Sequence, residues 1–287
     1  MAELAILIVS YNTKADLERC LRSLHEHPPR LSHEIVVIDN ASTDGSVEAV
    51  RSRWPQVRVI ALDKNAGFAR ANNEGIRQTT GELMLLLNSD TIVPNGAIDR
   101  LSQDMSALPG ASIVGPRLVD EQGVPELSFG RMLGPLAELR QKAIGRFAGR
   151  RRIAAMTSHI RVVDWVSGAC LLVRRRDAEA AGLLDERYFM YCEDVDFCAA
   201  VRATGGRVYF TPAAEVVHLR GRSGVFDTDA TARAYRRSQL AFYQKHHPFW
   251  VPALRLYLAL QGQLPGKRAD IGGGSNKGRR KKEEGKE

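Results

Sequence analysis

Residues 4–39 read LAILIVSYNTKADLERCLRSLHEHPPRLSHEIVVID, and this stretch decides the fold class. The apolar run Leu4–Ser10 is typical of a strand that is buried on both faces of a parallel sheet. A helix is expected over Ala15–Leu24, because its apolar residues recur at helical spacing and Pro28-Pro29 follows it. A second strand over Glu34–Asp39 then completes a β-α-β unit.

The same alternation continues as far as residue 87. The predicted elements are a helix that opens at the Ser42–Gly45 turn and runs to Arg53, a strand over Val57–Leu62, a helix over Phe68–Gln78 and a strand over Leu83–Leu87. Strands that alternate with helices indicate an α/β fold. The expected architecture is a mostly parallel, Rossmann-like sheet flanked by helices.

The second half of the chain is less regular. The arginine-rich segment Gln141–Arg161 is interpreted as an excursion or a mobile loop, and order is expected to return over Val162–Val173. The elements expected after it are helices near Asp177–Ala181 and Val195–Thr204, strands at Val208–Phe210 and Glu215–Val217, a helix over Thr228–His246, and an amphipathic or apolar stretch over Trp250–Leu260. We therefore predict three parts: a domain over residues 1–225, a C-terminal helical extension over 226–265 and a tail over 266–287.

Composition limits the class of protein. Apolar residues make up 44% of the chain and charged residues 26%, as in an ordinary globular protein. No apolar run approaches the roughly 20 residues that span a bilayer, and the start shows no leader pattern, so a cytoplasmic protein is expected. The four cysteines lack paired CxxC spacing and are expected to be reduced and mostly buried.

Half of the net charge of +8 lies in the last 21 residues. This tail, residues 267–287, holds eight Lys and Arg against four Asp and Glu, and its composition predicts disorder. The rest of the chain is only mildly basic and shows no basic pattern interleaved with aromatic residues. Nucleic acid is therefore not expected as a partner.

Polar residues follow the predicted strands directly, at the end of a parallel sheet where ligands bind. Ser10, Tyr11 and Asn12 follow the first strand, and Asp39 and Asn40 end the second. A carboxylate at Asp39 would accept from a base N–H or a ribose hydroxyl. A plain turn and helix cap explains the Ser42–Asp44 part of this segment equally well.

The fourth strand ends in Asn88, Ser89 and Asp90. Side chains at i and i+2 of an extended segment point the same way, so Asn88 and Asp90 could grip a divalent cation that holds a diphosphate. A strand-end turn accounts for the same residues as well.

Two later places carry titratable groups. Glu193, Asp194 and Asp196 stand at a predicted helix start, and their mutual repulsion would raise one pKa, which suits a general base. A solvated acidic helix cap is the alternative. His218 ends a strand beside a Gly- and Arg-rich loop and is either a metal ligand or a structural histidine.

The ordered set of motifs from residue 4 to 224 resembles family 2 glycosyltransferases of the GT-A fold, and within them the bacterial rhamnosyltransferase-like group. The motifs are IVSYN (8–12), VIDNASTDGS (37–46), NAGFARANNEGI (65–76), LLNSDT (86–91), DWVSGACLLVRR (164–175), FMYCEDVDFC (189–198) and VVHLRGRS (216–223).

The resemblance implies a role for each candidate residue. The implied nucleotide-sugar site is formed by Ser10, Tyr11, Asn12, Asp39, Asn40, Asn65, Arg70, Asn88 and Ser89. Asp194 matches the general base, with Glu193 beside it, and Trp165, Gly168 and Asp196 belong to the sugar and acceptor site. Asp90, Asn88 and His218 are the implied ligands of Mg²⁺ or Mn²⁺. Asn88 departs from the acidic residue that opens the DxD motif, which puts its ligation in doubt.

The implied reaction is a single displacement with inversion at the anomeric carbon. The resemblance points to rhamnose from dTDP-rhamnose as donor, and to a cell-envelope glycan or a lipid-linked precursor as acceptor. The Trp250–Leu260 stretch and the basic tail could rest on the anionic inner face of a membrane, or pack on the domain with the tail solvated. The arginines within 146–161 could likewise meet a lipid phosphate or be solvated.

Other classes fit the motifs less well. A dehydrogenase needs GxGxxG after the first strand and a kinase a P-loop, but the chain has SYNTKAD there. A nucleotidyltransferase would be expected to carry a basic, Gly-rich loop at that place. A catalytically inactive nucleotide-sugar binding module stays open because of Asn88.

Overall fold

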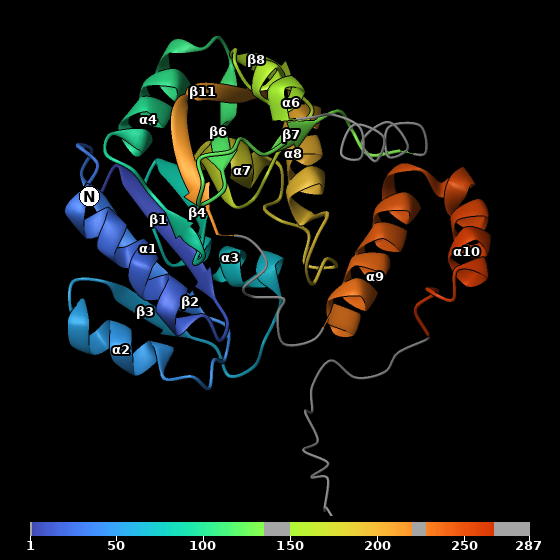
Figure 1. Cartoon of the computed structure of the whole chain (residues 1–287), viewed down its shortest axis with the longest axis horizontal. Helices are drawn as coiled ribbons and strands as arrows, with labels where there is room; N and C mark the ends of the chain where they lie inside the picture. Colours follow the sequence, from blue (N-terminus) through green and yellow to red (C-terminus); the bar gives the residue numbers. More distant parts are fainter. Residues whose placement is uncertain (1, 135–149, 220–227, 267–287) are drawn as a thin grey trace, which may run out of the picture.

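The structure, a computed structural model, describes residues 2–134, 150–219 and 228–266 (Figure 1). One nine-stranded sheet forms its centre. Its strands are β1 (Leu4–Ser10), β2 (His33–Asp39), β3 (Arg58–Ala61), β4 (Leu83–Asn88), β5 (Thr91–Ile92), β6 (Ala111–Val119), β8 (Arg161–Val163), β10 (Cys170–Arg174) and β11 (Arg207–His218). A second, two-stranded sheet pairs β7 (Phe129–Gly130) with β9 (Trp165–Val166).

Helices cover both faces of the central sheet. They are α1 (Lys14–Glu26), α2 (Ser46–Arg53), α3 (Phe68–Arg77), α4 (Ala97–Ala107), α6 (Arg150–Met156), α7 (Arg175–Ala180), α8 (Glu193–Ala203), α9 (Thr228–His246) and α10 (Val251–Leu260), with a 3₁₀ turn, η1 (Pro248–Trp250). Side chains of α1, α2 and α4 pack into one core, and those of α3, α7, α8 and α9 pack into the other. The fold is therefore three layers, α/β/α.

Strand β1 shows why the apolar run predicted a central strand. Leu4, Ile6 and Ile8 enter one core, whereas Ala5 and Leu7 enter the other, and all five are fully buried. Burying each Leu or Ile side chain is worth about 1.5–3 kcal/mol, so both faces of β1 stabilise the domain.

The sheet follows the order β3-β2-β1-β4-β10-β6-β11-β5, with β8 beside β11. Strands β3, β2, β1 and β4 are parallel, and β6 and β11 run in the same direction because two antiparallel pairings flank β10. Only β5, β8 and β10 of the described strands run the other way. The predicted α/β fold with a mostly parallel sheet is confirmed.

Three features differ from the sequence prediction. Helix α4 and strand β6 were not predicted. The two short strands predicted at 208–210 and 215–217 are one strand, β11, whose register against β6 shifts between Thr211 and Glu215. Pro212 lacks an N–H for the ladder, so the irregularity falls at the apparent gap.

The predicted excursion at 141–161 is wrong at its end. There, α6 forms and β8 begins at Arg161, whereas residues 141–149 lie outside the described part. The four cysteines are free and buried, as predicted.

The C-terminal helices lie beside the domain (Figure 1). Phe242 and Tyr243 of α9 are buried in the core that α8 also enters. The predicted boundary at 225/226 falls between described segments and the predicted disordered tail from 267 lies outside them, so the three-part division stays a prediction. Among the described helices, none is both long and apolar enough to cross a membrane.

Candidate functional site

The carboxyl ends of β1, β2 and β4 meet at one edge of the sheet. Ser10 pairs with Asp39, and Val9 pairs with Asn88, so the polar residues that follow the strands converge as predicted. The loops after β1 and β2 are also bonded together. Asn12 accepts a hydrogen bond from the Thr43 N–H at its Oδ1 (2.8 Å), and its own N–H donates to the Ser42 Oγ (2.9 Å).

Asp39 lies at the floor of this edge and is only 2% exposed. Its Oδ2 accepts from the Ser42 N–H at 2.9 Å, but its Oδ1 is buried without a hydrogen-bond partner among the described residues. Leaving a buried polar atom unpaired costs about 1–3 kcal/mol, and more for a charged group. A ligand N–H or hydroxyl at this position would remove that cost.

Asn40 and Asn65 shape the neighbouring loop through its backbone. Asn40 Oδ1 accepts from the Ala66 N–H (2.7 Å), its Nδ2 donates to the Gly67 carbonyl (3.3 Å), and Asn65 Oδ1 accepts from the Gly67 N–H (3.1 Å). Gly67 has φ +85°, and a Cβ there would lie 2.4 Å from the Phe189 carbonyl oxygen. The loop therefore packs directly on the segment that leads to the acid cluster.

The remaining donor-side residues divide into buried supports and exposed groups. Thr13 Oγ1 lies 3.1 Å from Ser10 Oγ and 2.9 Å from Ser89 Oγ, in a buried chain that ties the ends of β1 and β4 together. Tyr11 is 42% exposed, and the exposed Arg70 lies 3.9 Å from Glu186. Ser10 and Ser89 are positioned to support the loops, while Tyr11 remains accessible at the edge.

Asp90 and His218 lie together beside this edge. His218 Nε2 is 3.4 Å from Asp90 Oδ1, and His218 Nδ1 is 3.7 Å from Glu126 Oε2. Burial disfavours the charged imidazole, but the carboxylates of Asp90 and Glu126 outweigh that effect and raise the pKa of His218 to about 9. Sequence reasoning missed Glu126, which sits in an unremarkable turn after β6.

A carboxylate and an imidazole side by side suit a divalent cation. No group of three His, Cys, Asp or Glu side chains within the described ranges is arranged to hold a metal ion. Part of any coordination shell would therefore come from a ligand. Residues 220–223 of the VVHLRGRS motif lie outside the described residues.

The acid pair stands on a strained turn. Tyr191 and Cys192 both have left-handed backbones, with φ +71° and +66°, directly before α8 begins at Glu193. Each left-handed non-glycine residue costs about 1–2 kcal/mol, and such strain gathers at functional sites. The turn places Glu193 and Asp194 at the N-terminus of α8, where the helix dipole favours negative charge.

Asp194 is the better placed of the two acids for proton transfer. Its Oδ2 accepts from the Gly168 N–H (3.0 Å) and its Oδ1 from the Val195 N–H (2.8 Å). Burial raises the pKa of Asp194, an effect that these two N–H groups partly offset. Glu193 is 7% exposed with an unpartnered Oε2, and burial together with the Asp194 charge raises the pKa of Glu193 well above its usual range.

Gly168 connects the acid pair to the end of β4. While its own N–H reaches Asp194, the carbonyl of the next residue, Ala169, accepts from the Asn88 N–H at 2.9 Å. A Cβ on Gly168 would lie 3.2 Å from the Asp194 Cβ, so the position is tight. Trp165, three residues before Gly168, is buried, and its Nε1 donates to the Arg131 carbonyl at 2.8 Å.

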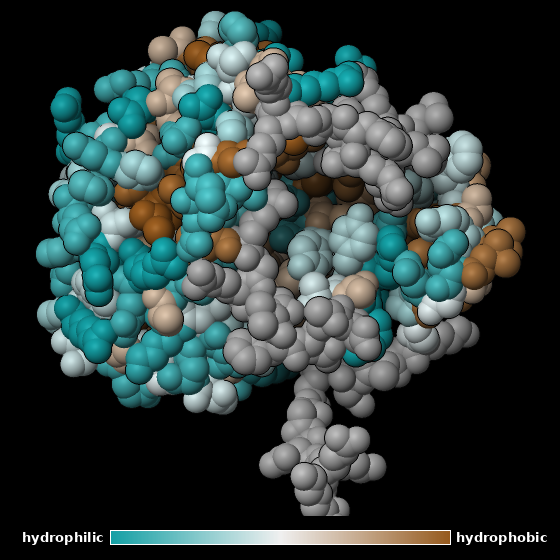
Figure 2. Space-filling model, viewed as in Figure 1, coloured by the Kyte–Doolittle hydropathy of each residue, from teal (hydrophilic) through white to brown (hydrophobic). Residues whose placement is uncertain are grey.

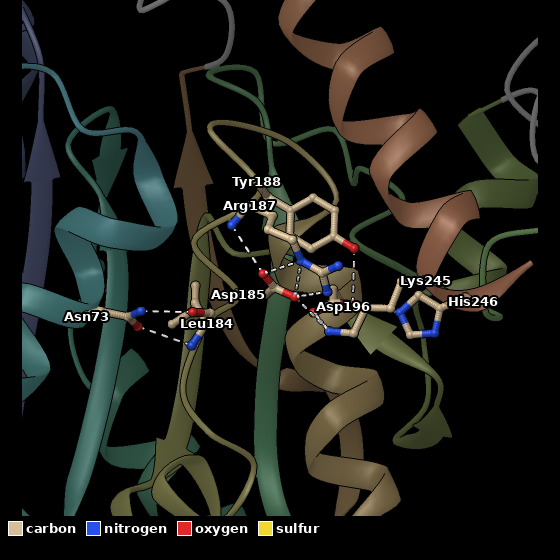
Figure 3. A network of polar contacts seen from close by, with 8 residues as sticks. All are labelled: Asn73, Leu184, Asp185, Arg187, Tyr188, Asp196, Lys245 and His246. Carbon is tan, nitrogen blue, oxygen red and sulfur yellow. Dashed lines mark hydrogen bonds and ion pairs between the residues drawn. The ribbon is translucent and has the colours of Figure 1, made fainter. Parts of the chain in front are cut away.

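Asp196 lies on the opposite side of α8 from Asp194. Two residues along a helix turn a side chain by about 200°, so Asp196 faces away from Asp194. Its Oδ1 lies 2.6 Å from His246 Nε2 and accepts from the Tyr188 hydroxyl (3.2 Å), and its Oδ2 accepts from Lys245 Nζ (2.7 Å). Asp196 therefore docks α9 on α8 (Figure 3), and its place in an acceptor site stays a prediction.

Figure 3 also shows how this network reaches the donor half. Asn73 of α3 makes two hydrogen bonds to the Leu184 backbone, at 2.8 and 3.1 Å, and the next residue, Asp185, accepts from Lys245 Nζ at 2.9 Å. Arg187 and Lys245 hold the pKa of Asp185 well below its usual range. Further along α9, the Ser238 hydroxyl donates to the Met190 carbonyl (2.7 Å), beside the strained turn.

A surface pocket lies at the opposite edge of the sheet, near Glu3, Leu83 and Arg174. Arg174 and Arg175 in its lining donate to backbone carbonyls, including those of Ala111 and Gly81. These arginines are therefore structural, and none of the sequence-predicted site residues lines this pocket.

Comparison with known proteins assigns the family. The model of "Glycosyl transferase family 2" matches residues 5–165. The N-acetylglucosaminyl-diphospho-decaprenol L-rhamnosyltransferase of Mycobacterium tuberculosis is 32% identical over 284 residues, which cover 91% of this chain and 92% of that protein. The low-salt glycan biosynthesis hexosyltransferase Agl10 of Haloferax volcanii is 25% identical over 75% of this chain and 67% of its own length.

A solved structure supports the fold. The mannosyltransferase PcManGT from Pyrobaculum calidifontis, in complex with GDP-Man and Mn²⁺, superposes with a TM-score of 0.60 at 19% identity, covering 92% of this chain and 72% of that one. The Rossmann-like GT-A fold implied by the sequence motifs is thus confirmed. With the family model covering more than half of its length, the chain belongs to glycosyl transferase family 2 and is a glycosyltransferase.

Proposed function

We propose that this glycosyltransferase moves a sugar from a nucleotide-sugar to a hydroxyl group of a lipid-linked acceptor, with inversion at the anomeric carbon. One observation carries the proposal: Asp194 is held by the Gly168 N–H, and the adjacent Ala169 carbonyl bonds to the end of β4. A base is thereby fixed beside the edge where the donor is expected.

Asp194 has the properties of a general base. Two N–H groups fix both of its carboxylate oxygens, and burial raises its pKa toward the range in which it can take a hydroxyl proton. The acceptor oxygen would attack the anomeric carbon as the bond to the diphosphate breaks, and its proton would pass to Asp194. A single displacement of this kind inverts the anomeric configuration.

The donor would lie across the ends of β1, β2 and β4. Asp39 would accept from the base or ribose through its unpartnered Oδ1, and the accessible Tyr11 ring would lie beside the nucleotide. Asp90 and His218 would hold a divalent cation, with Asn88 as a further oxygen donor. That cation would neutralise charge on the leaving nucleoside diphosphate.

Support for the sugar and acceptor comes from the relatives. The Mycobacterium tuberculosis relative is named for L-rhamnose transfer to N-acetylglucosaminyl-diphospho-decaprenol, and it aligns over nearly its whole length. The PcManGT structure holds GDP-Man and Mn²⁺. We therefore propose dTDP-rhamnose as donor, Mg²⁺ or Mn²⁺ as cofactor, a polyprenyl-diphosphate-linked sugar as acceptor, and the cytoplasmic side of a membrane as the place of reaction.

The test measures nucleoside diphosphate release from a panel of nucleotide-sugars, with and without a polyprenyl-diphosphate-linked acceptor. Each reaction is run with Mg²⁺, with Mn²⁺ and with EDTA, for wild type and Asp194→Asn. We expect one donor to support acceptor- and metal-dependent release that the variant loses.

Two results would contradict parts of the proposal. Turnover in the presence of EDTA would show that the reaction does not need a divalent cation. Unchanged turnover in Asp194→Asn would show that Asp194 is not the general base. Donor binding without turnover on any acceptor would favour the nucleotide-sugar binding module instead.

A further inference from the structure

Helices α9 and α10, joined by η1, form a C-terminal helical hairpin that carries an apolar stripe on its outer face. Phe249, Leu256 and Leu260 are 95%, 63% and 78% exposed, and Ala253 between them is exposed too. Their spacing of four, three and four residues places them on one side of the η1–α10 segment. Trp250 lies beside the stripe at 53% exposed. Figure 2 shows hydrophobic atoms at the right-hand edge, where Figure 1 places α10.

The stripe is not needed to pack the helix on the protein. Val251 and Leu254 pack against the core and Leu258 is fully buried, and these three form a separate, inner stripe of α10. A surface helix of a globular domain usually has a polar outer face. Helix α10 instead is apolar on both sides and carries one charged residue, Arg255.

The basic residues that follow the stripe in the sequence indicate which partner it binds. Residues 267–287 begin shortly after α10 and contain eight Lys and Arg against four Asp and Glu. Aromatic and leucine side chains beside a basic segment suit the interface of an anionic bilayer. A second copy of the chain would bring the same basic segments together, so like charges would face one another. The ten residues of α10 are about half the length that spans a bilayer.

We infer that Phe249, Trp250, Leu256 and Leu260 form a membrane-docking surface, on which α10 lies in the interface of an anionic bilayer. The Ser238 hydroxyl of α9 also donates to the Met190 carbonyl, beside the turn that carries Asp194. A bilayer on this surface would thus lie on the side where the proposed function expects a lipid-linked acceptor. The exposure of the stripe and the charge beside it do not depend on that function.

The test is co-sedimentation of the full chain with vesicles of phosphatidylcholine and phosphatidylglycerol, and with vesicles of phosphatidylcholine alone. Wild type is compared with the triple variant Phe249→Ser/Leu256→Ser/Leu260→Ser. Val162→Ser is the matched control, because Val162 on β8 is 64% exposed, as much as Leu256. We expect the triple variant to lose at least about tenfold in partitioning and the control to change less than about twofold. Binding should be stronger to the anionic vesicles and weaken with salt.

Several outcomes would overturn the inference. The inference is wrong if wild type stays in the supernatant with both kinds of vesicle. It is also wrong if the triple variant binds the vesicles as strongly as Val162→Ser does. If wild type is a dimer, the triple variant is a monomer and neither binds vesicles, the stripe is instead an interface with a second copy of the chain. A lower Tm with unchanged vesicle binding would assign it to another segment of the same chain. Donor hydrolysis without acceptor should be equal in wild type and the triple variant, so a failure of the catalytic proposal is seen separately.

Discussion

The two halves of the sheet build their parts of the site in different ways. In the half formed by β3, β2, β1 and β4, the polar residues follow parallel strands, and the loops after β1 and β2 bond to each other across about 30 residues. In the other half, Asp194 depends on a strained turn, on Gly168 from the β9–β10 segment and, through Met190, on α9. The proposed donor edge thus depends on β-α-β units, whereas the position of Asp194, the proposed base, depends on tertiary packing.

The largest expected effect is on kcat, and it distinguishes the two halves because a substitution in each half should change a different kinetic parameter. Asp194→Asn removes the proton acceptor, so kcat should fall about 10²–10⁴-fold while the KM for donor stays within a few fold. Asp90→Asn should instead raise the Mn²⁺ concentration needed for half-maximal rate at least about tenfold, because a carboxylate ligand is lost. Initial rates over a matrix of donor and Mn²⁺ concentrations measure both. If both variants changed the same parameter, the two halves would not act as separate sites.

The second prediction tests the contact between the halves. Gly67→Ala places a Cβ 2.4 Å from the Phe189 carbonyl oxygen at φ +85°, whereas Gly182→Ala, at φ +84°, meets nothing within 4 Å. Both should lose about 1–2 kcal/mol to the left-handed backbone, and Gly67→Ala about 1–3 kcal/mol more through the clash. Urea unfolding measures the difference.

Kinetics on the same two variants sharpen the comparison. Gly67→Ala should raise donor KM and lower kcat together, since it separates the donor loop from the segment before the acid pair. Gly182→Ala should leave both near wild type. Equal stability losses in the two variants would show that the loop contact at Phe189 is not tight.

The third prediction concerns the α8–α9 network. Lys245→Met leaves the 1%-exposed Asp196 with Tyr188 and His246 as its side-chain partners among the described residues. Breaking a buried ion pair costs about 3–5 kcal/mol, and the partial exposure of Lys245 reduces this to about 2 kcal/mol. The free energy of unfolding in urea measures the loss, with Gln244→Met, an exposed neighbour on α9, as the control. Equal values for both variants would contradict a docking role for Asp196.

The sequence predicted the half formed by β3, β2, β1 and β4 well because its signals are local. The continuous apolar run of β1 reports burial on both faces, and a polar residue directly after such a run lies at the ligand end of a parallel strand. Asp39 and Asn88 were found in this way, and their register beside Ser10 and Val9 follows from the β-α-β topology.

The other half was harder to predict because its determinants are distant. The sequence spacing alone predicts that Asp196 lies on the opposite face of the helix from Asp194, because two residues turn a side chain by about 200°. Its partners Lys245 and His246, however, are 49 and 50 residues away and could not be named. Glu126 lies in a turn after β6, a strand that was not predicted, and nothing local marked it as a neighbour of His218.

A pH-dependent effect distinguishes the two acids. Burial and the Asp194 charge raise the folded-state pKa of Glu193, so the folded chain keeps a proton that the unfolded chain releases above about pH 4.3. Wild type should therefore lose stability relative to Glu193→Gln as pH rises above the pKa of the unfolded chain, until Glu193 ionises in the folded chain. Thermal unfolding across that range measures the difference. Glu48→Gln, an exposed Glu-to-Gln change on α2, is the matched control substitution. A constant difference for Glu193→Gln would mean that Glu193 ionises normally at the head of α8, and that the acid pair is not held in a desolvated site.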